Sequence, residues 1–137
     1  MSFQSDVKKW SEKALKRYRA TAKTAVQEVV AEAQTPRGKS GRMPIKTGFL
    51  QHSLVAAIGN VPYGESKNPG NMAFTYDPSS VSATLLRWNP EKETFYAAYV
   101  AQYAIPMEYR YGFLRGAVEN WDQHVAKAAK EAERRIR

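Results

Sequence analysis

The first third of the chain repeats apolar residues at steps of three and four, and this repeat constrains the fold more than any other feature of the sequence. It predicts one α-helix from about Ser5 to Ala33, capped by Ser2 or Ser5 and ended by Thr35-Pro36. At about 1.5 Å per residue the helix is about 40 Å long, which is more than a domain of this size covers alone. We therefore expect part of its apolar stripe to pack on another subunit. The alternative is that the stripe, Trp10 and Tyr18 included, only covers the domain's own core.

A second helical repeat lies near the end of the chain and predicts a helix from about Phe113 to Arg135. Gly112 precedes this helix. The arginines in its last turn suit the negative end of the helix dipole, so their clustering has a structural explanation and does not by itself indicate a binding site. His124 lies on the margin of the apolar stripe, where a lone histidine is more often a packed or surface residue than a ligand.

Between the two helices the sequence changes to short runs rich in β-branched and aromatic residues, separated by turn residues. These runs predict a small antiparallel sheet, in which Asn89–Glu93 closes a hairpin between the last two strands, and residues 62–72 form a long polar loop. The whole pattern predicts a single α+β domain over residues 1–137, with both long helices packed on one face of the sheet. The predicted strands are Ser53–Ile58, Ala73–Tyr76, Val81–Trp88 and Thr94–Tyr99.

The join between the first helix and the sheet is cationic. Residues 35–46 carry four basic side chains and no acid, and two glycines and two prolines there predict a mobile loop outside any regular element. The chain has a net charge of +8, which lies in this loop and at both ends, and such a field favours nucleic acid, anionic lipid or an acidic protein surface. We expect the loop to face DNA or an acidic partner, with ordinary solubilising charge as the alternative. Its basic residues are Arg37, Lys39, Arg42 and Lys46.

The composition argues against several functions. The chain has no cysteine and two distant histidines, which argues against disulfides, cysteine nucleophiles and structural zinc. Gly38-Lys39-Ser40 is not a nucleotide-binding loop, because Ala33 stands where such a loop needs a glycine. With no nucleophile placed beside a base and an acid, we predict no catalytic residues, no cofactor and no metal, and hence no enzyme. No long apolar run is present, so we expect a soluble protein made in the cytoplasm and no membrane partner.

Tyrosines concentrate between Tyr96 and Tyr111. Tyrosine offers a large ring and a polar tip, and it is enriched where protein surfaces meet. One interpretation is a subunit interface, and the other is that these rings complete a small core. A base-stacking surface fits less well, because only Arg110 is basic in that segment. The candidate interface residues are Trp10, Tyr18, Tyr99, Tyr103, Tyr109 and Tyr111.

Three short motifs occur in a fixed order: Thr-Gly-x-Leu-x-x-Ser from Thr47, Tyr-Ala-x-Tyr-Val from Tyr96 and Phe-Leu-x-x-Ala from Phe113. Together with the long first helix and the basic loop, this order resembles the neck and tail-completion proteins of long-tailed bacteriophages, including the minor tail proteins similar to lambda protein Z. The likeness spans most of the chain. One departure concerns the second motif, which in the family usually continues with an acid and a glycine, whereas here Glu108 and Gly112 come later.

The resemblance implies a structural, non-enzymatic virion component made in the host bacterial cytoplasm. Such a component forms a homo-oligomeric ring, expected to be hexameric, that joins the head to the tail or finishes the tail end. Its expected partners are other phage head-completion, connector and tail proteins. The resemblance also allows non-specific contact with packaged DNA.

Two other classes of function stay open at the level of sequence. A free nucleic-acid-binding protein would use the basic helix from Lys8 to Lys23 together with the loop. A membrane-surface protein would use Trp10 and the lysines of the same helix, although alanines dilute its apolar face.

Overall fold

The longest element of the computed structural model, which describes residues 2–137, is helix α1 (Phe3–Gln34). Ser2 caps it, because the Ser2 Oγ accepts a hydrogen bond from the Ser5 backbone N–H at 3.2 Å. Asp6 lies in the first turn, at the positive end of the helix dipole. The helix ends where Thr35, the residue before Pro36, turns to extended geometry. The predicted helix and both of its end signals are confirmed.

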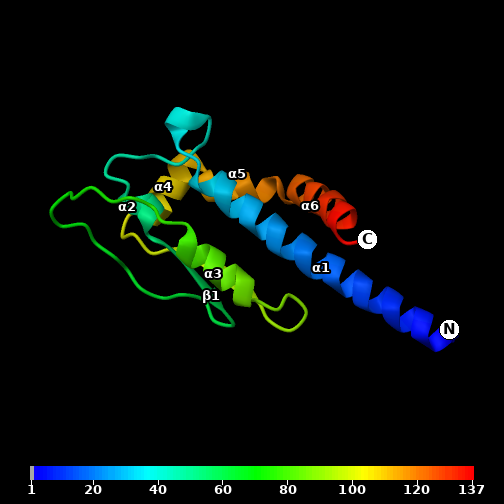
Figure 1. Ribbon diagram of the computed structural model, residues 1–137. Helices are drawn as coiled ribbons and strands as arrows, with labels where there is room; N and C mark the ends of the chain where they lie inside the picture. Colours follow the sequence, from blue (N-terminus) through cyan, green and yellow to red (C-terminus); the bar gives the residue numbers. More distant parts are fainter. Residues whose placement is uncertain (1) are drawn as a thin grey trace.

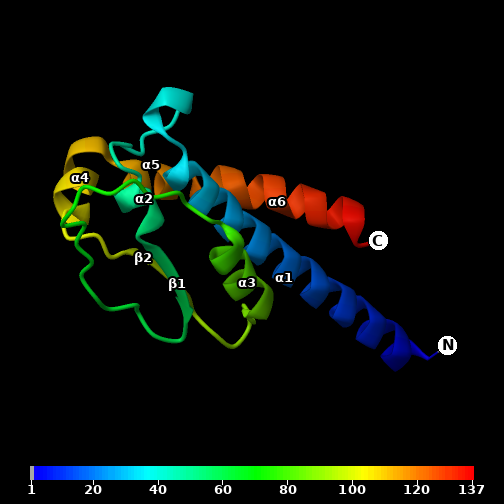
Figure 2. The ribbon, with the colours of Figure 1, turned by 60° about the vertical axis from the view of Figure 1, so that its left-hand side comes forward.

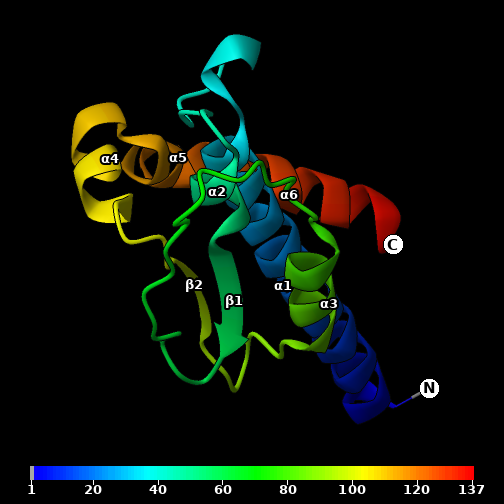
Figure 3. The same ribbon diagram turned by 90° about the vertical axis from the view of Figure 1, so that its left-hand side faces the viewer.

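Short helices and a two-stranded antiparallel sheet follow α1 and give the predicted α+β fold (Figure 1). Helix α1 lies between the sheet with its neighbouring helix on one side and the last helix on the other (Figures 1 and 3). In chain order the elements are the 3-10 helix Arg37–Lys39, α2 (Phe49–His52), β1 (Leu54–Ile58), α3 (Ser79–Arg87), β2 (Phe95–Tyr99), α4 (Ala104–Tyr111), α5 (Phe113–Glu119) and α6 (Trp121–Arg135).

Helices α1 and α6 run side by side in opposite directions, so both chain termini lie at the same end of the molecule (Figures 1 and 2). Helix α6 therefore packs along α1, and the expectation that both long helices cover the sheet is wrong for α6. The Arg17 Nε donates to the Ile136 carbonyl oxygen at 2.8 Å, which places the end of α6 beside Arg17. Residues 3–16, here called the α1 overhang, continue beyond that point for about 20 Å at about 1.5 Å per residue.

The single C-terminal helix of the sequence prediction is divided at Asn120 into α5 and α6. Asn120 leaves helical geometry, with φ −91° and ψ 13°, and its side-chain amide donates to Glu32 of α1 at 2.8 Å. Helix α4 had no counterpart in the prediction and fills the turn between the sheet and α5. Glu108 of α4 and Gly112, which follows its last residue, are the acid and the glycine that come later than in the motif described above.

Strands β1 and β2 pair in antiparallel register from Leu54 opposite Tyr99 to Ile58 opposite Phe95, so two of the four predicted strands are confirmed. The other two are wrong. Residues 73–76 form no strand, and Val81–Trp88 lies mostly in helix α3. The predicted hairpin is therefore wrong as well, because the turn at Asn89–Glu93 joins a helix to a strand.

Helix α3 forms because its start and its spacing both favour a helix. The Asp77 carboxylate accepts the Ser79 N–H at 2.9 Å, which satisfies one of the free donors of the first turn. Val81, Thr84 and Leu85 stand at helical spacing and are all buried. They pack with Leu54 of β1 and with the C-terminal half of α1.

The core consists of two clusters that meet at Tyr99. One contains Met43 and Phe113, which are completely or almost completely buried, and the other contains Leu54 and Leu85. The Tyr99 hydroxyl donates to the Gln34 side-chain oxygen at 2.5 Å. Burial raises the pKa of Tyr99 above its usual value, so this hydroxyl stays protonated and able to donate at neutral pH.

Gly48, in the first phage-like motif, occupies a position that excludes other residues. Its φ is +81°, and a Cβ there would lie 2.2 Å from the Phe74 carbonyl oxygen. The Phe74 N–H in turn donates to the Thr47 carbonyl oxygen at 2.7 Å, which holds the two segments together. The close approach of the Phe74 backbone therefore explains the glycine.

We predict that Gly48→Ala lowers the free energy of unfolding by more than about 2 kcal/mol, since it adds a backbone clash to the strain of a positive φ. Gly59→Ala is the matched control: its φ is +89°, but a Cβ there meets nothing within 4 Å. The control should lose only about 1 kcal/mol in the same denaturant titration. Equal losses in the two variants would contradict the steric explanation.

Candidate assembly and anion-facing surfaces

The cationic segment 35–46 is a hydrogen-bonded turn that extends from the end of α1 (Figure 1). Arg37 N–H donates to the Met43 carbonyl at 3.0 Å, and Met43 N–H donates to the Thr35 carbonyl at 3.1 Å. Met43 itself is completely buried and anchors the segment in the core. A short 3-10 helix spans Arg37–Lys39, so the prediction that no regular element forms here is wrong at those residues.

The four cations of this segment differ in their surroundings. The Arg42 Nη1 lies 2.9 Å from Glu32 Oε2, so Arg42 is paired and the expectation of four uncompensated charges is wrong for it. The Arg37 guanidinium lies 4.8 Å from the centre of the Tyr111 ring, where the ring face attracts it. Lys39 and Lys46 are exposed and join no ion pair among residues 2–137.

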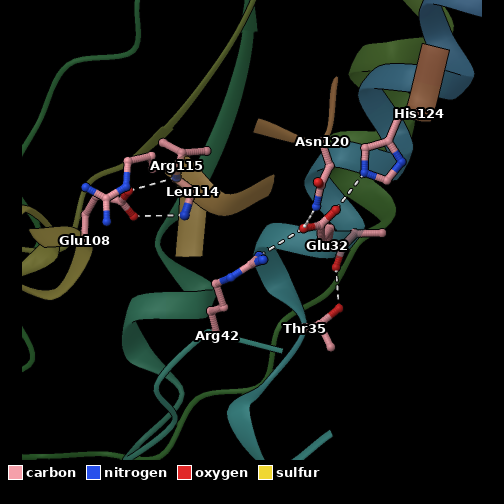
Figure 4. A network of polar contacts seen from close by, with 9 residues as sticks. Glu32, Thr35, Arg42, Glu108, Leu114, Arg115, Asn120 and His124 are labelled. Atoms are coloured by element: carbon pink, nitrogen blue, oxygen red, sulfur yellow. Dashed lines mark hydrogen bonds and ion pairs between the residues drawn. The ribbon is translucent and has the colours of Figure 1, made fainter. Parts of the chain in front are cut away.

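Glu32 joins three parts of the chain, as Figure 4 shows. Its carboxylate accepts from Arg42 of the basic turn at 2.9 Å, from Asn120 between α5 and α6 at 2.8 Å, and lies 2.7 Å from His124 Nε2 of α6. Partial burial alone would raise the pKa of Glu32, but these three side chains favour the charged carboxylate and lower the pKa below its usual value. Arg42 also lies against α5, where a Cβ on Gly116 would stand 2.5 Å from its Cζ.

Sequence reasoning missed this network. The available signal was the position of Glu32, which falls seven residues after Ala25 and three after Val29, on the apolar stripe of the helix. An acid on such a stripe needs polar partners on the helix that covers it. His124, correctly placed on the margin of its own stripe, is one of them.

Glu108 fixes the start of α5. Its two carboxylate oxygens accept the backbone N–H groups of Leu114 and Arg115 at 2.9 and 2.8 Å (Figure 4). Gly112 has a φ of +62°, which lets the chain turn from α4 into α5. The acid and the glycine thus shape the surface on which α4 and α5 meet.

The candidate interface residues fall into two groups. Trp10, Tyr18 and Tyr109 are 71%, 52% and 88% exposed and accessible to a partner, whereas Tyr103 is only 38% exposed and its ring lies 6.2 Å from that of Phe49. Tyr99 mainly packs in the core, edge-on against Phe113 at 4.9 Å, and the part of it that stays accessible lines the groove beside Ala97 and Ala98. The half-buried Tyr111 contacts the guanidinium groups of Arg37 and Arg110.

Two exposed apolar surfaces lie far apart on the chain. The first is the α1 overhang with its neighbour Tyr18, where Phe3, Val7 and Trp10 are exposed and the ribbon shows no helix beside the N-terminal part of α1 (Figure 2). The second, here called the α4–α5 face, stands at the opposite end of the molecule and includes a groove of about 290 Å³ against Ala97 and Ala98 of β2. Ile105 and Leu114 line this groove, Tyr109 and Val118 follow them by one helical turn on α4 and α5, and Trp121 begins α6; all five are exposed.

A separate cavity of about 390 Å³ lies between the basic turn and the 62–72 segment. Lys46 and Lys67 both line it, with Asn68 and Gln102 and without an acid. Sequence reasoning missed Lys67, because nothing in the linear sequence brings it near Lys46.

The part of the chain that the structure describes contains neither a cluster of metal-ligating side chains nor a helix able to span a membrane. No group of three or more His, Cys, Asp or Glu side chains among residues 2–137 could hold a metal ion. No helix in the same range is long and apolar enough to span a bilayer.

Comparison with protein-family models found no match, and comparisons with curated proteins and with solved structures found none either. The resemblance to phage neck and tail-completion proteins, and the function it implies, therefore stay predictions from the sequence motifs.

We predict that Glu32→Gln lowers the free energy of unfolding by about 1–2 kcal/mol near neutral pH, because the neutral amide binds the Arg42 guanidinium less strongly than the carboxylate does. The lowered pKa of Glu32 means that its carboxylate stabilises the fold above the usual value of 4.5, and that this stabilisation is lost as the pH falls through the folded-state pKa. The difference between variant and wild type should therefore narrow below about pH 4.5 in denaturant titrations.

Glu119→Gln is the control, since it removes the same charge from an exposed residue that joins no ion pair among residues 2–137. It should leave stability nearly unchanged at every pH. A deficit in Glu32→Gln that persists undiminished in acid would show that the carboxylate charge is not what stabilises the network.

Proposed function

We propose that this protein is a structural subunit that binds copies of itself head to tail and closes into a ring at the neck or tail end of a long-tailed phage. The observation that carries the proposal is the pair of exposed apolar surfaces, the α1 overhang and the α4–α5 face, at opposite ends of one chain. Soluble chains rarely leave such surfaces uncovered. Two different surfaces that bind each other make a heterologous contact, and such contacts close into rings when the rotation between neighbours allows it.

The two surfaces complement each other in shape and charge. The α1 overhang is a convex helix that presents Phe3 and Trp10, whereas the α4–α5 face is hollowed by its apolar groove. Residues 3–19 carry six basic side chains and two acids. Residues 104–122 on the α4–α5 side carry three acids and two bases, so this side lacks the basic excess of the overhang. Opposite charges of this kind set the orientation of an encounter more than its affinity.

The phage assignment is supported by the way the three sequence motifs meet. The Val100 N–H of the second motif donates to the Ser53 carbonyl of the first at 3.2 Å. Tyr99 of the second packs on Phe113 of the third, and Phe113 shares a core cluster with Leu50 of the first. The first and second motifs are more than forty residues apart in sequence, and the three motifs together form one packed unit. This is expected if they mark a common fold. By the resemblance, the ring has six copies, contacts other connector and tail proteins, and surrounds the path of the DNA.

A free nucleic-acid-binding protein is the second candidate, favoured by the same excess of basic residues on the first half of α1. The two functions differ in what the purified chain does. A ring component associates with itself, whereas a free binder remains monomeric and holds DNA.

We predict that wild-type protein self-associates and that Trp10→Glu and Ile105→Glu each abolish this, because each places a charge on one of the two surfaces. Mixing the two variants should give a dimer and no larger species, since each retains one intact surface. Leu86→Glu is the control: Leu86 is 78% exposed on α3, outside both surfaces, and the variant should assemble like wild type. Native mass spectrometry and light scattering measure the species.

Three results would contradict the proposed assembly. Variants that each still dimerise would indicate a symmetric contact of one surface with itself. A mixture that stays monomeric while wild type assembles would show that these two surfaces do not bind each other. Wild-type protein that stays monomeric at every concentration and binds DNA instead would favour the second candidate.

A further inference from the structure

The end of the molecule where α6 stops beside α1 contains a shallow depression of about 510 Å³. Side chains from both helices line it, although they are more than one hundred residues apart in sequence. Figure 1 shows this end, where the C-terminus lies beside the middle of α1. The lining residues are Lys13, Arg17, Lys130, Glu133, Arg134 and Arg137.

The depression is strongly cationic, since five of its six lining side chains are basic. None of the five joins an ion pair among the residues that the structure describes. Arg17 is used in part to cap α6, because its Nε donates to the Ile136 carbonyl. The negative end of the α6 dipole amounts to about half an elementary charge, which offsets only a small part of the total. The remaining charges repel one another until an anion binds.

The basic turn at 35–46 makes a weaker case for an anion site. Arg42 is paired with Glu32, and Arg37 lies on the Tyr111 ring. The arginines of the last turn of α6, which the sequence explained by the helix dipole alone, gain Lys13 and Arg17 from another helix only through the fold. The α1–α6 depression is therefore a stronger candidate for DNA contact than the basic turn at 35–46.

We propose that the α1–α6 depression binds the phosphate backbone of duplex DNA without reading its sequence. The cations come from two helices and are solvent-accessible, an arrangement that meets several phosphates in a row and does not enclose a single small anion. A hollow between helices admits a phosphodiester strand, whereas a flat bilayer surface would contact convex faces first. Contacts of this kind act through charge, so binding must weaken steeply as salt rises. The identity of this DNA as the packaged genome rests on the proposed phage function.

The test compares two variants of equal net charge in the purified full-length protein. The depression variant carries Lys13→Gln, Lys130→Gln, Arg134→Gln and Arg137→Gln, and keeps Arg17 because it caps α6. The control variant carries Lys39→Gln, Lys46→Gln, Lys67→Gln and Lys92→Gln, which are exposed lysines elsewhere. Binding to a labelled duplex of about 20 base pairs is followed by fluorescence anisotropy from about 50 to about 200 mM salt.

The depression variant should bind the duplex at least about tenfold more weakly at low salt. The slope of log affinity against log salt is negative and should become less steep by about 3 to 4 in this variant, since each lost phosphate contact removes about 0.9 from its magnitude. The control variant should stay within about threefold of wild type and keep the slope. A third variant with Lys13→Arg and Lys130→Arg keeps the charge and should bind like wild type, which separates a loss of charge from a loss of folding.

Equal losses in the depression and control variants would overturn the site, because net charge alone would then explain binding. Wild-type protein that fails to bind the duplex at low salt would overturn it too, as would binding to vesicles of anionic lipid without binding to the duplex. Self-association is measured separately by the mixing experiment. If the protein does not self-associate but the duplex-binding results are as expected, the ring is rejected and the DNA-binding depression stands. If the protein self-associates but the depression variant binds the duplex no more weakly than the control, only the depression is rejected.

Discussion

The antiparallel packing of α1 on α6 is the constraint on which the rest of the structure depends. Helix α1 has 32 residues and α6 has 15, so one end of α1 must extend past its partner. The Glu32 network decides which end. By holding Arg42, Asn120 and His124 at the C-terminal end of α1, it fixes α5 and α6 there and leaves the N-terminal overhang without a covering helix. The exposed apolar stripe is thus a consequence of where the helices are joined.

The features that the sequence predicted well are those set by local periodicity and local caps. Helix α1 was predicted because its apolar residues repeat with the helical period, and strands β1 and β2 were predicted because runs rich in β-branched and aromatic residues lie between turn residues. Val81–Trp88 was mistaken for a strand because its β-branched and aromatic residues suit both structures, and the decisive signal was the Asp77 cap just before it. The break at Asn120 was not predictable from the helix pattern, since it depends on a hydrogen bond to Glu32, 88 residues away.

Some residues of the candidate surfaces could likewise be predicted from local sequence, and others depend on the tertiary structure. The exposure of Trp10 followed from the length of the first helix, which sequence alone provides. The core position of Tyr99 could not be predicted in this way, because the sequence does not distinguish a tyrosine packed between two core clusters from a tyrosine at a surface. Charge was the hardest property to place: the pairing of Arg42 with Glu32 and the meeting of Lys13 with Lys130 both require the tertiary fold.

Two surfaces of different chemistry now have separate roles in the account. We propose that apolar faces at opposite ends of the chain bind neighbouring copies and that a cationic depression at the α1–α6 end binds phosphates. In a closed ring each depression recurs once per subunit, so weak contacts by single copies add up along a DNA strand. The basic turn at 35–46 keeps a structural role, because Met43 and Arg42 anchor it to the core and to α1.

The central claim is that the α1 overhang of one copy binds the α4–α5 face of the next. Site-specific photo-crosslinking from position 10, followed by mass spectrometry of the joined peptides, tests it most directly. We expect crosslinks between position 10 of one copy and residues 104–121 of another. Crosslinks from position 10 to residues 3–16 of a second copy, or to no other copy at all, would contradict this contact.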